Sequence, residues 1–139
     1  MKRSLSNLVT ALFLAGGAHA ATLTVDLSGV EARGGKLYIS VQTKDQYQKK
    51  EGIGDVIEAP EAGDHTYTYD VPEGRYAVSI WHDDNANDVF DVGGKYGMPQ
   101  DGWAMHKGME LRSAPTFELV SVDVTAAGAT VSEKMTYGR

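Results

Sequence analysis

Residues 65–82, HTYTYDVPEGRYAVSIWH, decide the fold, because two alternating segments flank one turn. Apolar and polar side chains alternate through 65–71 and again through 75–82, which is the period of half-buried strands. Between the two segments, proline fixes one backbone dihedral of a tight turn and glycine tolerates the positive φ of another. The stretch therefore predicts a β-hairpin formed by 65–71 and 75–82.

The same alternation recurs on both sides of this hairpin. A short edge strand is expected at 56–59, and longer strands at 22–30, 36–43, 116–124 and 129–137. The strands at 22–30 and 36–43 are expected to pair as a second hairpin. With no long helical period after residue 20, the pattern predicts an all-β fold. We expect an antiparallel β-sandwich of about six to eight strands, immunoglobulin-like or transthyretin-like, with one long loop.

The first twenty residues have the pattern of an export signal. Two basic residues open the chain, residues 8–15 are mostly apolar, and AHA at 18–20 matches the small-x-small pattern of signal-peptidase cleavage. The apolar part is too short for a permanent membrane span. We therefore expect cleavage after Ala20, a single β-sandwich domain over 21–139, and a periplasmic or secreted protein without a membrane span.

Charge and cysteine content narrow the classes of partner. Cleavage would remove Lys2 and Arg3 from the 13 basic residues and leave all 19 acidic ones, a net charge of about −8. That charge argues against nucleic acid and anionic lipid surfaces and favours cations. The chain has no cysteine, which excludes disulfides, thiolate zinc sites and cysteine nucleophiles. Stability therefore comes from packing or from a bound ion.

An acidic loop follows the second strand of the first hairpin. Residues 82–102 read HDDNANDVFDVGGKYGMPQDG, with four aspartates and two asparagines between Asp83 and Asp91. The D-x-N-x-N-x-x-x-D spacing is that of a calcium loop, in which alternate side chains converge on one centre. Carboxylates this close repel one another, and a divalent cation removes that cost. We therefore predict that the acidic loop binds calcium as a structural ion.

Calcium takes six to eight oxygen ligands at about 2.3–2.6 Å. The predicted ligands combine side chains of the loop, one backbone carbonyl and one downstream carboxylate: Asp83, Asn85, Asn87, Val89 (carbonyl), Asp91 and Asp101. Gly94 stands where helical calcium loops carry a bidentate glutamate, so Asp101 has to complete the shell. Asp84 and Asp88 are expected to lie behind the ligands or to face solvent. The alternative is a turn that caps its own backbone amides and binds no ion.

The histidines offer a different interpretation. His82, Asp83 and His106 form a candidate transition-metal site, which would make the protein a metal-dependent enzyme. No short spacing such as i, i+4 supports that site. The competing expectation is that His82 ends its strand and donates to a loop carboxylate, while His106 lies on the surface. Nucleophilic catalysis has less support, because the chain lacks a G-x-S-x-G motif.

Trp81 and Trp103 flank the acidic loop and form a further alternative. Exposed together, they would make a platform for a glycan or a peptide. Tyr67, Tyr69 and Tyr76 lie on predicted strands and are expected to pack against the sheet. The function predicted first is an exported calcium-binding β-sandwich that serves as a binding or interaction module. Its expected partners are a divalent cation and a protein, peptide or glycan at the loop face.

Three consecutive motifs resemble a bacterial family. VPEGRYAVSIWHDDNANDVFD, then YGMPQDGW and APTFE, are similar to the proteins grouped as "domain of unknown function 2141". The shared pattern is a proline-glycine turn, a strand, a loop like H-D-x-N-x-N-x-x-x-D and then G-x-P-x-[ED]-G, over Asp70–Glu118. The resemblance implies a small exported β-sandwich without an assigned reaction.

Overall fold

The computed structural model describes residues 20–139, and the predicted export signal lies outside this range apart from its last residue. Within these residues the fold consists of eight strands, two single 3-10 turns (η) and one short helix. Their bounds in chain order are β1 Ala20–Val30, β2 Leu37–Gln42, β3 Ile53–Ile57, β4 Gly63–Pro72, β5 Gly74–His82, η1 Lys95–Gly97, β6 Gly102–Met105, η2 Gly108–Glu110, α2 Phe117–Val120, β7 Ser121–Val124 and β8 Ala129–Lys134.

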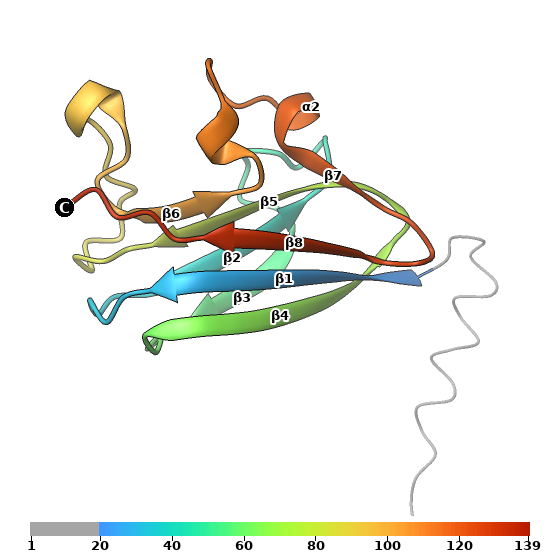
Figure 1. The fold of residues 1–139 in the computed structure, drawn as a ribbon, viewed down its shortest axis with the longest axis horizontal. Coiled ribbons are helices and arrows are strands. Elements are labelled where there is room, and N and C mark those ends of the chain that lie inside the picture. The colour runs from blue at the N-terminus through green and yellow to red at the C-terminus, as the bar shows by residue number, and fades with distance from the viewer. Residues whose placement is uncertain (1–19) are drawn as a thin grey trace, which may run out of the picture.

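The strands form two sheets packed face to face, which confirms the predicted β-sandwich (Figure 1). Sheet A has the order β4-β1-β8, and sheet B has the order β3-β2-β5-β6, with β7 paired to the other end of β5. Strands β1 and β8 run parallel, so the expectation of wholly antiparallel sheets is wrong at that pair. The immunoglobulin-like or transthyretin-like subtype stays a prediction.

Both predicted hairpins are wrong, although their strands exist. Strand β4 pairs with β1 in sheet A, whereas β5 pairs with β2 in sheet B, so the turn after Pro72 carries the chain from one sheet to the other. The hydroxyl of Tyr76 donates to the carbonyl of Pro72 at 2.7 Å and braces this crossing. Alternation shows which side chains of a strand are buried, but it does not show which strand lies beside it.

The core lies between the inward faces of the two sheets. Inward side chains on β1, β2, β5 and β8 are almost completely buried, among them Leu23, Val25, Leu37, Val78 and Val131. Burying one such side chain contributes roughly 1.5–3 kcal/mol, so this layer supplies most of the favourable free energy of folding. The sandwich therefore holds its shape without disulfides, as the sequence requires.

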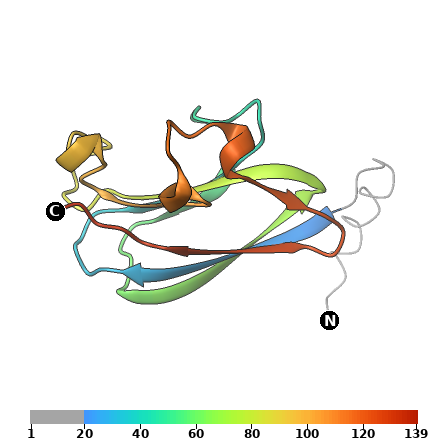
Figure 2. The same cartoon turned by 45° about the horizontal axis from the view of Figure 1, so that its top comes forward.

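The segment predicted as one loop, 83–115, contains structure. Strand β6 pairs with β5 inside it, with Trp81 opposite Trp103 and His82 opposite Gly102. Four residues are too few to show a strand period, which explains the omission. Farther on, the segment expected to begin a strand at 116 forms α2, capped by the Thr116 side chain. Figure 2 shows η2 and α2 on the outer side of sheet B, where α2 packs on Ala77 of β5.

Candidate functional site

The acidic loop, residues 82–102, connects β5 to β6 at one end of the sandwich. The pairing of His82 with Gly102 clamps its two ends together. Farther out, the backbone N–H groups of Gln100 and Asp101 reach the carbonyl of Asp91 at 2.8 and 3.5 Å. The end of the sequence lies beside this loop (Figure 1). Residues distant in sequence can therefore contribute to one site here.

Asp83 shapes the loop from within. Its carboxylate is 1% exposed and accepts the backbone N–H groups of Asn87 at 3.2 Å and Asp88 at 2.8 Å. Ala86 and Asp88 take positive φ angles of 58° and 61°, which the tight turn around this carboxylate imposes. Both oxygens of Asp83 thus cap backbone amides, which is the behaviour expected of an ion-free turn.

Asp101 lies against the loop, as the calcium prediction requires. It is completely buried, and its Oδ2 accepts the indole N–H of Trp81 at 2.8 Å and the backbone N–H of Asp91 at 3.1 Å. Two donors on one oxygen hold the carboxylate in a single orientation. Its other oxygen, Oδ1, points toward Arg139.

Asp91 is the acceptor at the centre of the loop. The side-chain amides of Asn85 and Asn87 donate to its Oδ2 at 2.8 and 3.0 Å. These hydrogen bonds, led by that of Asn85 and joined by the Arg139 guanidinium, hold the pKa of the Asp91 carboxyl below its usual value. Asn87 Oδ1 accepts the backbone N–H of Val89 at 3.0 Å. In this arrangement the asparagines orient their amide nitrogens toward the carboxylate.

The guanidinium of Arg139 fills the centre of the site. Its Nε donates to Asp84 Oδ1 at 3.0 Å, its Nη1 to Gln100 Oε1 at 3.1 Å, and its Nη2 to Asp91 Oδ2 at 3.0 Å. Nη2 also contacts Asp101 Oδ1. Four side-chain oxygens from four residues therefore surround one cation. We call this set the oxygen cage: Asp84, Asp91, Gln100 and Asp101.

Asp84 does not face solvent, because its side chain is 1% exposed and contacts the guanidinium of Arg139 directly. Its second oxygen lies 3.5 Å from the guanidinium of Arg33. The sequence carries no local signal for Arg139, which lies 38 residues beyond Asp101. Only the return of the chain along β8 brings it to the loop, through the backbone pairing of Thr136 with Trp103.

The donor chemistry of the oxygen cage suits calcium, but its spacing is that of a guanidinium. Within residues 20–139, no three His, Asp or Glu side chains converge closely enough to hold a metal ion. Only some of the predicted calcium ligands lie at the oxygen cage. Asp91 and Asp101 meet at one nitrogen of Arg139, whereas Asp83 is engaged with the backbone. A calcium ion would have to replace the guanidinium and draw the oxygens inward.

The two histidines lie in separate environments. The His82 ring is completely buried, with Nε2 2.7 Å from the carbonyl of Gly34 and Nδ1 2.8 Å from the hydroxyl of Tyr137. Both ring nitrogens are thus engaged. Neither contacts a loop carboxylate, so the expectation that His82 donates to one is wrong. His106 is half-buried rather than on the surface, and its Nδ1 lies 3.0 Å from Glu133 Oε1. These contacts give a structural role to His82.

The tryptophans stand upright on the outer face of sheet B. Trp81 stacks on Tyr38 of the neighbouring strand, with ring centroids 4.6 Å apart and planes 14° from parallel. Phe90 of the acidic loop packs against Trp81 edge-on, with centroids 5.9 Å apart. Since one ring face and the indole N–H are already engaged, Trp81 supports the loop from below.

The strands and the acidic loop together match one known family. A family model described as "Uncharacterized protein conserved in bacteria (DUF2141)" matches residues 25–132. The chain belongs to the DUF2141 family. The match runs from β1 to β8 and includes the whole acidic loop, and it ends before Arg139. No curated protein and no solved structure matches this DUF2141 chain. Within the described part of the chain, none of the helices has the length and apolar character needed to cross a bilayer.

Proposed function

We propose that this DUF2141 protein is an exported β-sandwich binding module whose acidic loop takes up calcium in place of the Arg139 guanidinium. The observation that carries this proposal is the oxygen cage, in which four side-chain oxygens already surround a cation. The export part of the proposal rests on the basic, apolar and small-residue pattern of residues 1–20.

Calcium has a clear advantage over arginine at such a place. Three carboxylates, those of Asp84, Asp91 and Asp101, share one positive charge from Arg139. Of these three, only Asp84 also contacts Arg33, which pairs with Glu31 as well. A divalent cation neutralises more of this charge and accepts six to eight oxygens. The side chain of Arg139 is 34% exposed, so it can leave the oxygen cage without rearranging the core. Rotation of the Asn85 and Asn87 amides would turn their oxygens toward the ion.

The test is a calcium titration of the wild type and of Arg139→Gln. We expect millimolar calcium to raise the melting temperature of the wild type above its value in excess chelator. Because Arg139→Gln removes the competing cation, that variant should be less stable in chelator and bind calcium more tightly. Asp101→Asn, which removes a cage carboxylate, should bind calcium more weakly than the wild type. Metal analysis of protein purified without chelator should then find calcium.

Identical melts in chelator and in calcium, for both the wild type and Arg139→Gln, would show that the arginine is a permanent structural cation. Stoichiometric zinc, copper or iron in the purified protein would instead contradict the calcium proposal and favour a transition-metal protein; a site of His82, Asp83 and His106 would then require His82 to give up its bonds to Gly34 and Tyr137.

A further inference from the structure

A second site lies at the edge of the sandwich where β6 of sheet B faces β8 of sheet A, away from the acidic loop. A cavity of about 710 Å³ opens where β6 and η2 diverge from β8. The backbone pairing of Trp103 with Thr136, at 2.8 and 2.9 Å, closes one end of it. Its volume falls within the range of small-molecule sites, about 300–1,000 Å³.

An acidic residue, Glu133, occupies an inward-facing position in the lining of this cavity. Val131 of β8 and Met135, which directly follows the strand, are buried and point inward, and Glu133 lies between them with the same parity. Its side chain is only 9% exposed. Burial raises the pKa of the Glu133 carboxyl more than the hydrogen bond from His106 lowers it. The ionised carboxylate therefore weakens the fold, and a perturbed carboxyl group inside a cavity is a candidate for function.

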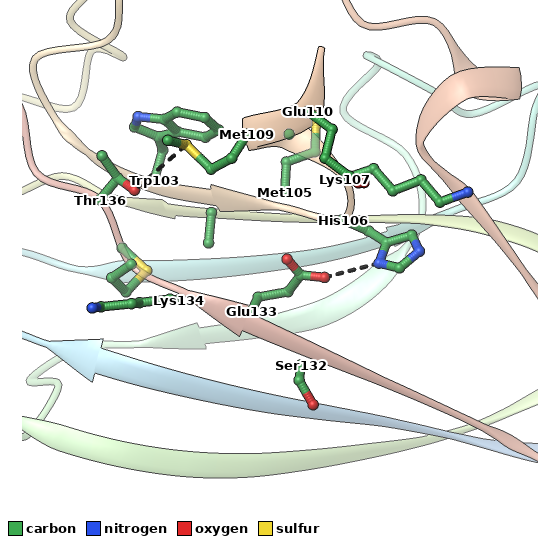
Figure 3. Close-up of a pocket in the computed structure, with 13 residues that line it drawn as sticks. Trp103, Met105, His106, Lys107, Met109, Glu110, Ser132, Glu133, Lys134 and Thr136 are labelled. Atoms are coloured by element: carbon green, nitrogen blue, oxygen red, sulfur yellow. Dashed lines mark hydrogen bonds and ion pairs between the residues drawn. The ribbon is translucent and has the colours of Figure 1, made fainter.

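Only half of this carboxylate is satisfied. Its Oε1 bonds to Nδ1 of His106 at 3.0 Å, and that is the only hydrogen bond of the Glu133 carboxylate within residues 20–139. Figure 3 shows the other oxygen directed away from His106, toward the middle of the cavity. The ammonium groups of Lys107 and Lys134, at opposite sides of the same view, point away from it. The side chain is largely buried and its free oxygen opens onto the cavity, an arrangement that suits a cationic or hydrogen-bond-donating ligand.

The part of the lining that β6 and η2 form suits an apolar or cationic group. The indole of Trp103 and the thioethers of Met105 and Met109 line it, and Met109 is 72% exposed. Gly108 packs directly on the Trp103 ring, where a larger residue would collide with the indole. An aromatic face and polarisable sulfurs attract organic cations as well as hydrocarbon.

From this arrangement we infer that the cavity binds a small organic cation, with its protonated nitrogen on Glu133 and its apolar body against Trp103 and Met109. The recognition combines charge complementarity at a buried carboxylate with aromatic packing, the usual means of holding an amine out of water. His106 acts as a positioning residue, because its bond to Oε1 leaves Oε2 facing the ligand. The site is independent of the acidic loop and of calcium.

The test uses benzylammonium and its neutral isostere benzyl alcohol as probes, followed through tryptophan fluorescence and the indole signal of Trp103 in NMR spectra, in the presence of chelator. We expect saturable binding of benzylammonium at ~1 mM or below and at least ~tenfold weaker binding of benzyl alcohol. Glu133→Gln keeps the shape of the side chain and an acceptor for His106, and it should weaken benzylammonium binding by at least ~tenfold. Glu110→Gln is the matched control, because Glu110 lines the same cavity but is exposed.

Three results would overturn the inference. The first is equal affinity for the ammonium and the alcohol, which would make the cavity merely apolar. The second is an equal loss in Glu110→Gln and Glu133→Gln, which would make the effect one of general charge. The third is zinc binding that depends on both His106 and Glu133 without any binding of benzylammonium, which would make the pair a metal site. Near-UV circular dichroism of each variant confirms that the fold is intact.

Discussion

Asp101→Asn tests whether the acidic loop is held to the sandwich by one buried carboxylate. In the wild type, Asp101 accepts the indole N–H of Trp81 and the backbone N–H of Asp91 on one oxygen and contacts Arg139 with the other. The substitution keeps the shape of the side chain but removes its charge. It also places an amide NH₂ group beside the guanidinium or beside the two N–H donors.

The expected cost follows from these two hydrogen bonds. A hydrogen bond to a charged group contributes about 1.5–3 kcal/mol, against about 0.5–1.5 kcal/mol for a neutral one. Losing roughly 1–1.5 kcal/mol at each of the two donors, Trp81 and Asp91, gives ~2–3 kcal/mol. For a domain of this length that corresponds to a fall of about 8–12 °C in melting temperature.

The assay is urea unfolding in excess chelator, so that no ion contributes, with the fluorescence of Trp81 and Trp103 as the signal. The control is Asp88→Asn in the same loop, whose exposed side chain makes no hydrogen bond within the described residues and should change stability by no more than about 0.5 kcal/mol. A loss in Asp101→Asn no larger than in this control would refute the reasoning. It would mean that the loop is held by its backbone contacts alone.

Three further outcomes are expected. Gly35→Ala should cost ~2–4 kcal/mol in urea unfolding, because Gly35 has a φ of +70° and an added methyl group would overlap the carbonyl of Asp83; a smaller loss would show that the loop yields. Tyr69→Phe should cost about 1–2 kcal/mol through the lost 2.8 Å bond to Asp55, which ties β4 to β3 across the sandwich, whereas an unchanged melting temperature would show that this bond is dispensable. In NMR titration, Asn85→Ala should raise the lowered pKa of Asp91, and an unchanged pKa would exclude Asn85 as the cause. In the wild type, the stability that the Asp91 carboxylate contributes is present above pH ~4 and should be lost as the pH falls through the lowered pKa.

The strands could be predicted because alternation is a local property. Leu23, Val25 and Leu27 of β1 are buried as their spacing indicates, and the inward residues of β2 and β5 follow the same rule. Pairing is not local. The consecutive strands β4 and β5 look like a hairpin in sequence, yet each finds its partner elsewhere because the turn between them changes sheets. Register is fixed by contacts between distant strands, which one alternating segment does not contain.

The residues of the two sites also differ in whether the sequence predicts them. The position of the acidic loop and the approach of Asp101 follow from spacing, since both belong to one connection between β5 and β6. Arg139 carries no such signal. Glu133 does carry one, because the alternation of 129–137 puts a carboxylate on the face that buries Val131 and Met135. A charged residue at an inward strand position is rare and costly, so the strand pattern by itself indicates a site there.

The segment that follows Val131 links the two sites physically. Glu133 serves the cavity, Thr136 pairs with Trp103, Tyr137 holds His82, and Arg139 fills the oxygen cage. The acidic loop thus supplies acceptors whose donors come from one stretch about forty to fifty residues later. Because Thr136 is paired to β6 by backbone bonds at 2.8 and 2.9 Å, Arg139 can leave the oxygen cage without disturbing Glu133. Calcium uptake and amine binding are therefore expected to be thermodynamically independent. The shortest route for any coupling is along the chain itself, because Asp101 of the oxygen cage lies two residues before Trp103 of the cavity.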